Sequence, residues 1–283
     1  MKPTRKQIWT IAYPILISLL MENMIGLTDT AFLGRVGEVE LGASALGSVY
    51  YLVIFMLGFG FGIGAQILIA RRNGEKAYAL IGPLFQQGLL FLLSLAAVMF
   101  VISHTFTPMV LRSLISSDEV YEAAVSYTNW RVFGFFFAFV AIMFRAFFVG
   151  ITNTKTLTLN SIVMVLSNVV LNYVLVFGKL GLPAMGIAGA AIASSASEMI
   201  SMVFFIVYTR LRIDHRKYGL FRFAGFSPKL LRGMLNVSVW TMIQMFVAIS
   251  TWFFFFIAVE HLGERPLAVT NIIRSVSGIV FVI

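Results

Sequence analysis

Residues 8–33, IWTIAYPILISLLMENMIGLTDTAFL, form an apolar run long enough to cross the hydrocarbon core of a bilayer as one helix. Two carboxylates, Glu22 and Asp29, nevertheless lie inside this run. A charged side chain at the centre of a membrane helix costs about 2.5–3.5 kcal/mol on insertion scales. The segment therefore predicts both a membrane-spanning helix and a polar function inside it.

The rest of the chain repeats this pattern. Of its 283 residues, 59% are hydrophobic and only 12% are charged, against about 45–50% and 25% in soluble domains. The apolar blocks are too long and continuous for barrel strands. We therefore predict an all-α, polytopic membrane protein with seven complete spans and an incomplete eighth, at residues 8–33, 42–70, 81–102, 126–152, 157–177, 186–208, 231–259 and 267–283.

Lysine and arginine set the orientation, because cytoplasmic loops carry an excess of them. Of the 21, 14 lie on the side of the N-terminus and 4 on the other; Arg131, Arg145 and Arg274 lie within or at the edges of spans. This distribution predicts a cytoplasmic N-terminus in the inner (plasma) membrane. The basic residues are spread over several loops, which argues against nucleic-acid binding, and the absence of cysteine excludes disulfides.

A weak internal repeat indicates two lobes. Shifting the chain by about 226 residues pairs Gly37 with Gly263, Glu38 with Glu264 and Leu41 with Leu267, so that the first and seventh spans align. We predict a six-helix N-lobe (1–208), a solvated, basic cytoplasmic linker (209–230) and the start of a C-lobe (231–283). The final apolar run has no flanking charge, so we expect further spans to follow it.

Polar residues inside spans are the candidate site. Glu22 and Asp29 are seven residues apart and share a helix face. Asn168 and Asn172 do so at i and i+4. For Asp29 and the two asparagines we favour a functional role over a structural one. The case for Glu22 is balanced.

For the remaining polar residues inside spans, the sequence gives weaker support for a functional role. In the sixth span, Glu198 shares a face with Ser194 and Ser201, among small residues that favour close helix packing. Arg145 is expected to be structural, either extending towards the cytoplasm or pairing with an acid such as Glu198. The glycines of LGFGFGIGAQ (57–66) predict close packing or a bend.

Enzyme signatures are missing from the sequence. It contains no G-x-S-x-G, H-E-x-x-H or P-loop motif, and His104, His215 and His261 are scattered through loops. A carboxylate, two amides and hydroxyls without a nucleophile suit cation handling better than covalent chemistry. We therefore predict a non-enzymatic protein with no metal or cofactor.

Several segments resemble one transporter family. PILISLLMENMIGLTDTAFLGRVGEVELGASALG (14–47), FRAFFVGITNTKT (144–156), LSNVVLNYVLVFG (166–178) and MGIAGAAIAS (185–194) are similar to the multidrug and toxic compound extrusion (MATE) family, nearer its DinF-like branch. The resemblance implies twelve spans in two lobes, V-shaped alternating access, and export of amphipathic, often cationic compounds in exchange for H⁺ or Na⁺. It also implies a monomer.

The family's first-span aspartate matches Asp29, and its fifth-span Asn…Asp pair matches Asn168 and Asn172, with Asn at the second position. Its sixth-span hydroxyl corresponds to Ser194. We predict H⁺ as the coupling ion rather than Na⁺, because one carboxylate is lost. Protonation of Asp29 would let the first span repack and release the substrate. The alternative within the superfamily is a lipid-linked saccharide flippase, which would need a basic cavity.

Overall fold

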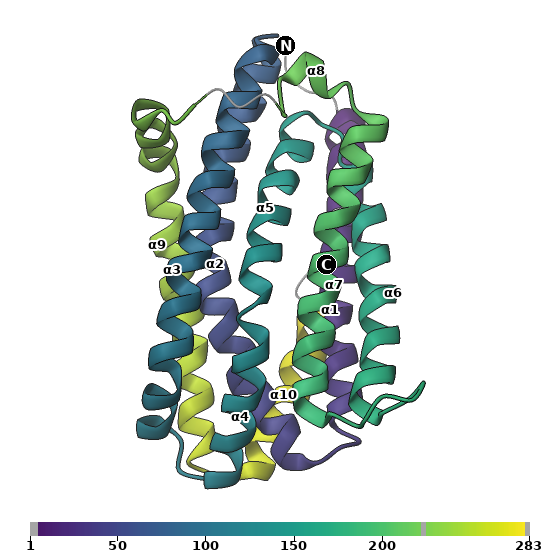
Figure 1. The fold of residues 1–283 in the computed structure, drawn as a ribbon, viewed down its shortest axis with the longest axis vertical. Coiled ribbons are helices and arrows are strands. Elements are labelled where there is room, and N and C mark those ends of the chain that lie inside the picture. The colour runs from purple at the N-terminus through teal and green to yellow at the C-terminus, as the bar shows by residue number, and fades with distance from the viewer. Residues whose placement is uncertain (1–4, 222–224, 281–283) are drawn as a thin grey trace.

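The computed structural model describes residues 5–221 and 225–280, and within these residues all regular structure is helical (Figure 1). Long helices run side by side along one axis, with the start of α1 and the short α8 at one end and α4 and the start of α10 at the other. The helices are α1 (Arg5–Leu33), α2 (Glu38–Gly74), η1 (Tyr78–Leu80), α3 (Ile81–Leu114), α4 (Asp118–Arg131), α5 (Gly134–Gly150), α6 (Lys155–Phe177), α7 (Gly186–Arg212), α8 (His215–Tyr218), α9 (Pro228–Glu260) and α10 (Glu264–Val280).

The number of spans agrees with the sequence. Among the described residues, six helices are long and apolar enough to cross a membrane, and the bent pair α4–α5 makes a seventh. Most helices exceed the predicted segments. Tyr78–Leu114 extends well past residue 102, and Glu38–Gly74 extends past 42–70 at both ends, whereas Pro228–Glu260 nearly coincides with 231–259. Helices need only about 20 residues to span the core, so these are tilted or project beyond it. The eighth predicted segment corresponds to α10, which has 17 residues.

The fourth span differs from its prediction. Instead of one helix from residue 126, the helix begins at Asp118, capped by the Ser117 side chain, which accepts a hydrogen bond from the Val120 amide. It then bends by 50° between Arg131 and Gly134. A side chain at Gly134 would overlap the Arg131 guanidinium and the Glu198 carboxylate. The bend therefore accommodates a charged contact between helices, which hydrophobicity alone does not reveal.

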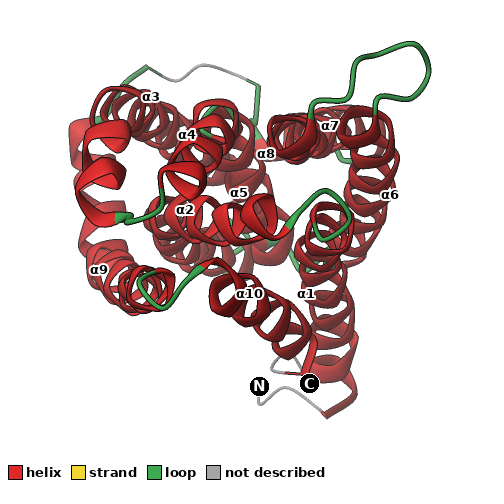
Figure 2. Cartoon of the chain, turned by 90° about the horizontal axis from the view of Figure 1, so that it is seen from below, coloured by secondary structure: helices red, strands yellow, loops and turns green. Residues whose placement is uncertain are grey.

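α2 lies in the middle of the bundle, between α5 and α9 (Figure 2). Its alternating glycines serve two faces. A side chain at Gly58 or Gly62 would collide with Phe139 or Ile142 of α5, and one at Gly60 or Gly64 with α9 at residues 241–242 and 238. These contacts support close packing, one of the two alternatives that the sequence left open, and α2 continues as one helix from Glu38 to Gly74.

The linker predicted at residues 209–230 is not simply solvated. α7 extends through its start to Arg212, and α9 begins inside its end at Pro228. Leu220 is buried in the apolar core, and Gln87 of α3 donates to the Gly225 carbonyl at 2.6 Å and accepts from the Ser227 amide at 3.2 Å. The described flanks of this segment are thus anchored on α3; residues 222–224 lie outside the described residues.

At the opposite end of the bundle, acidic side chains at the junction of α9 and α10 bind the start of α4. The buried Glu260 carboxylate accepts from the backbone amides of Ser116 and Ser117, at 3.0–3.1 Å. Glu264 accepts from the Ser117 hydroxyl at 2.7 Å. Both carboxylates sit at the N-terminus of α4, where the helix dipole favours negative charge. These contacts tie the predicted C-lobe to the N-lobe at this end.

Candidate functional site: a polar pocket inside the bundle

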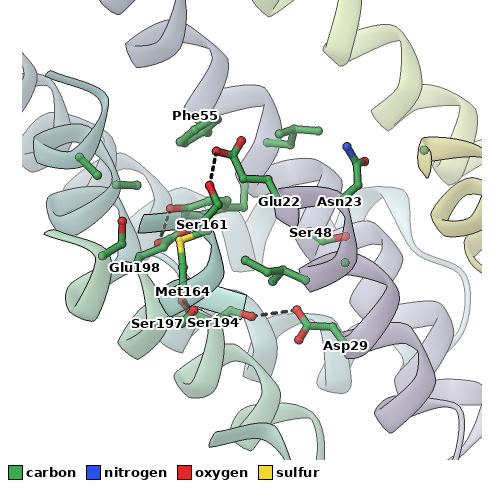
Figure 3. A pocket seen from close by; sticks show the side chains of 18 of the residues that line it. Glu22, Asn23, Asp29, Ser48, Phe55, Ser161, Met164, Ser194, Ser197 and Glu198 are labelled. Carbon is green, nitrogen blue, oxygen red and sulfur yellow. Dashed lines mark hydrogen bonds between the residues drawn. The ribbon is translucent and has the colours of Figure 1, made fainter. Parts of the chain in front are cut away.

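A pocket of about 600 Å³ opens between α1, α2, α4, α5, α6, α7 and α10 (Figure 3). Its apolar wall includes Leu52, Phe55, Met56 and Phe59 of α2. The remaining lining includes three carboxylates, on Glu22, Asp29 and Glu198, and three guanidinium groups, on Arg131, Arg145 and Arg274. Ionisable groups in a membrane interior face cavities or partners, and this pocket supplies both.

Asp29 is the meeting point of three helices. Its carboxylate on α1 accepts hydrogen bonds from Asn172 Nδ2 at 2.7 Å and Asn168 Nδ2 at 3.3 Å, both on α6, and from Ser194 Oγ on α7 at 2.8 Å. The structure therefore brings together all four residues that the sequence predicts for the coupling site. Asp29 and Ser194 line the pocket, and Asn168 and Asn172 lie fully buried behind them.

The two asparagines also carry spare acceptors. Asn168 Oδ1 and Asn172 Oδ1 are buried and have no hydrogen-bond partner among the described residues. A carboxylate only accepts hydrogen bonds, whereas a carboxylic acid also donates one. The cluster thus holds donors for the ionised form of Asp29, and amide oxygens that suit either a proton on Asp29 or an oxygen-coordinated cation.

Glu22 is paired with Arg145. Arg145 Nη1 of α5 donates to Glu22 Oε1 of α1 at 2.6 Å, and Ser18 and Ser161 donate to the same oxygen at 3.3 and 3.5 Å. Figure 3 shows the Glu22 carboxylate turned towards Ser161. Arg145 therefore pairs with an acid, which is one of its two predicted alternatives, but the acid is Glu22 and not Glu198. As predicted, Glu22 and Asp29 lie on one side of α1, both facing the pocket.

Glu198 is paired with Arg131, a residue that the sequence did not single out. Arg131 Nη1 and Nη2 of α4 donate to the two oxygens of Glu198 at 2.8 and 2.5 Å. Tyr51 of α2 donates its hydroxyl to Glu198 at 2.9 Å, and its ring lies 3.5 Å from the Arg131 guanidinium carbon. Arg131 lies just before the bend between α4 and α5, and its side chain lines the pocket. Its place at the edge of a predicted span does not by itself predict this role.

Hydroxyl and amide side chains also form hydrogen bonds between neighbouring helices that line the pocket. Ser201 on α7 exchanges hydrogen bonds with Asn160 on α6, at 2.8 and 3.0 Å. Thr30 of α1 lies 2.8 Å, oxygen to oxygen, from Ser275 of α10. Among the described residues, no cluster of His, Asp or Glu has the arrangement of a metal site.

Comparison with known proteins agrees with this architecture. A family model described as MatE matches residues 14–174. A probable multidrug resistance protein NorM from Mannheimia succiniciproducens is 24% identical over 281 residues, which is 98% of this chain and 60% of that protein. Another, from Synechocystis, is 28% identical over 240 residues, covering 84% of this chain and 51% of that one.

Among solved structures, the eukaryotic MATE transporter AtDTX14 superposes with a TM-score of 0.81 at 20% identity, covering 97% of this chain and 61% of that one. This similarity concerns the fold. The chain spans about 60% of the length of the curated relatives it matches over its full extent.

Proposed function

The chain belongs to the MatE family, and on this premise we propose that it is part of a multidrug efflux transporter that exports amphipathic, often cationic compounds in exchange for protons. The relatives named multidrug resistance proteins support the substrate class. The protein would act without enzymatic chemistry, as a monomer in the inner membrane with its N-terminus in the cytoplasm. Protonation of Asp29 would be the coupling event.

One observation carries the assignment to Asp29. Of the three carboxylates that line the pocket, Glu22 and Glu198 each bind an arginine, whereas Asp29 binds only neutral donors within the described residues. Protonating Glu198 would leave the nearly buried Arg131 guanidinium without its counter-charge, which costs about 3–5 kcal/mol. Protonating Glu22 would likewise break its ion pair with the partly exposed Arg145. Protonating Asp29 breaks no ion pair, so Asp29 is best suited to exchange a proton repeatedly.

The packing of α1 supports a change of conformation on protonation. Only 11% of the apolar window of α1 is buried, against 50% for α2. Polar contacts join α1 to α6, among them the Asp29 cluster and the contact between Ser18 and Ser161 at 2.6 Å. Loss of charge at Asp29 would weaken the hydrogen bonds from Ser194 and Asn172. α1 would then be free to repack and alter the pocket.

Transport by this scheme requires that proton and substrate bind the alternating states differently. A substrate cation would be attracted to the ionised Asp29 and released once that residue is protonated. The apolar wall formed by Phe55, Met56 and Phe59 would accept varied hydrophobic bodies, since methionine and aromatic side chains adapt to different shapes.

A transport assay with the full-length protein tests the proposal. Proteoliposomes containing a fluorescent cationic dye receive an H⁺ or a Na⁺ gradient, with Asp29→Asn in parallel. We expect H⁺-driven dye movement that Asp29→Asn abolishes. Thr28→Val is the matched control, because among the described residues the Thr28 hydroxyl bonds only the Met24 carbonyl of its own helix. Full H⁺-driven transport by Asp29→Asn would refute the role of Asp29.

The same assay separates the rival functions. Movement driven by Na⁺ alone would contradict proton coupling and favour cation binding at the amide oxygens. No dye movement under either gradient would favour a lipid-linked saccharide flippase. Against that alternative, two of the three pocket arginines are already neutralised by Glu22 and Glu198, so the pocket is not a broadly basic cavity.

A further inference from the structure

We propose that Arg274 on α10 is an anion subsite of the pocket, so that the exported amphiphiles include compounds that carry a carboxylate, sulfonate or phosphate group. The inference rests on the proposed function, because it concerns what the same pocket binds. It adds a specificity-determining residue on a helix outside the Asp29 cluster.

The charges that line the pocket do not all pair with one another. The Arg131–Glu198 and Arg145–Glu22 pairs account for two cations and two anions. Asp29 and Arg274 remain, and within the part of the chain that the structure describes, neither lies within 4.0 Å of an opposite charge. Each of these two residues is held by neutral side chains instead.

Arg274 is oriented by neighbours that leave part of its guanidinium unused. Nη2 donates to Asn271 Oδ1 at 3.0 Å and to Ser48 Oγ at 3.3 Å. Nε is buried and has no partner among the described residues. The Phe256 ring lies 5.6 Å from the guanidinium carbon. Arginine has five N–H donors and no acceptor. Because Nε is buried and Nη2 is occupied, the donors left for a ligand are those of Nη1, which makes no hydrogen bond within the described residues.

Asn271, which accepts a hydrogen bond from Arg274, is itself held in place by neighbouring groups. Asn271 is buried, and its Nδ2 donates to the Leu41 carbonyl at 2.9 Å and to Ser44 Oγ at 3.4 Å. These bonds orient Asn271 Oδ1 towards Arg274. A guanidinium that is positioned before the ligand arrives loses less entropy on binding. The arrangement therefore has the character of a formed subsite rather than of a flexible surface arginine.

Arg274 and Asp29 remain separate although their helices touch. The next residues along, Thr30 and Ser275, lie 2.8 Å apart, oxygen to oxygen, where α1 meets α10. Asp29 is directed to Asn172 and Ser194, and Arg274 to Asn271 and Ser48. An unpaired cation inside a membrane is costly. An anionic group on a bound amphiphile would supply the missing counter-charge by a bidentate contact.

Two dyes that differ in one carboxylate test the subsite. Rhodamine B carries a free carboxylate, and its ethyl ester has the same cationic chromophore without it. Fluorescence anisotropy with the purified full-length protein gives a Kd for each dye. We expect Arg274→Gln to weaken rhodamine B binding by about tenfold or more, as the loss of a charge-assisted hydrogen bond implies, and ester binding by less than about twofold.

Two further variants keep the test specific. Arg274→Lys preserves the charge and should retain most of the preference for the acid. Arg265→Gln removes an exposed arginine from the same helix and should change neither Kd. An unchanged ratio of the two Kd values in Arg274→Gln, with a normal unfolding temperature, would overturn the subsite, whether both dyes bind more weakly or neither does.

Failure of the subsite is distinguishable from failure of the proposed function. The subsite is measured as a ratio of two dissociation constants in detergent, without any gradient. The proposed function is measured as gradient-driven dye movement in vesicles and its loss in Asp29→Asn. An acid preference that depends on Arg274 supports the subsite whatever the vesicle result, and its absence overturns the subsite even where transport is normal.

Discussion

Arg131 donates to both oxygens of Glu198, and its guanidinium lies against the Tyr51 ring. This single contact joins α4, α7 and α2 inside the membrane. The arginine and glutamate side chains are only 10% and 14% exposed. Because both charges are nearly buried, the contact imposes an orientation on three helices that apolar packing would leave free to rotate.

The Arg131–Glu198 pair should be intolerant of losing one partner. We expect Arg131→Met or Glu198→Gln to lower the free energy of unfolding by about 3 kcal/mol or more, because the remaining charge is left buried without a partner. The double variant Arg131→Met/Glu198→Met should recover much of this loss. Denaturant unfolding in detergent, followed by tryptophan fluorescence, measures both.

The Arg72–Glu75 pair at the end of α2 is the control, because it is solvent-exposed. Glu75→Gln should have no measurable effect on unfolding. A double variant of Arg131 and Glu198 that is as unstable as the sum of the single variants would show that the pair itself contributes nothing.

Asn172→Asp should change which ion the Asp29 cluster binds. The substitution places a second carboxylate where the closest donor to Asp29 now stands, at 2.7 Å. Two adjacent carboxylates either share one proton, so that only one is ionised, or stay ionised together around a bound cation. We expect Na⁺ to raise the unfolding temperature of the variant by several degrees at neutral pH while leaving the wild type nearly unchanged.

Choline chloride at equal ionic strength controls for screening in that experiment. Asn168→Asp is a useful comparison, because Asn168 is the more distant donor, at 3.3 Å, and should give a smaller Na⁺ effect. An identical Na⁺ response in wild type and Asn172→Asp would contradict the prediction.

The Glu260 contact should keep one end of the pocket closed. Removing it with Glu260→Ala frees the amides of Ser116 and Ser117. We expect this to favour the state open at that end, which we propose faces outside. In a cysteine-free background, a Met56→Cys reporter in the pocket wall should then react several times faster with an impermeant maleimide added from outside.

Ser113→Cys serves as the labelling control, since Ser113 is exposed near the same end and should react at one rate in both backgrounds. Slower or unchanged labelling at Met56→Cys in the Glu260→Ala protein would rule out a closing role for this contact.

The face of α2 that carries Gly60 and Gly64, here called the glycine face, should not tolerate larger side chains where it packs against α9. A Cβ at Gly60 would lie 2.7 Å from the Met242 Cα, and one at Gly64 would overlap Ser238. We expect Gly60→Ala and Gly64→Ala each to destabilise the protein by about 1–3 kcal/mol, the usual cost of overpacking. Gly74→Ala, at a position with no heavy atom within 4 Å, should be tolerated. The unfolding temperatures of the three variants test this prediction, and a Gly60→Ala or Gly64→Ala protein as stable as Gly74→Ala would contradict it.

Much of the fold is readable from the sequence, because a membrane leaves the backbone few options. Each long apolar run must form a helix to satisfy its own hydrogen bonds, so the lengths of the runs predict the number of spans. The bend between Arg131 and Gly134 is not readable in this way. It depends on an ion pair with Glu198, which lies three helices away.

The candidate site likewise has features that the sequence predicts and features that it does not. Spacing along α6 places Asn168 and Asn172 on one face, and this is enough to predict that they act together. Which acid meets which arginine depends on how the helices rotate against one another. Arg145 therefore meets Glu22 rather than Glu198, and Arg274 needs α10 packed on α2 before its position in the pocket becomes apparent.

The glycine face of α2 also has a consequence for biogenesis. α2 leaves the ribosome long before α9, since more than 150 residues separate Gly64 from Pro228. Until α9 is inserted, the groove at Gly60 and Gly64 can be filled only by lipid. Final assembly of the first helices must therefore wait for a segment made much later. An insertion intermediate that ends before α9 should expose this groove to the bilayer and to quality-control proteases.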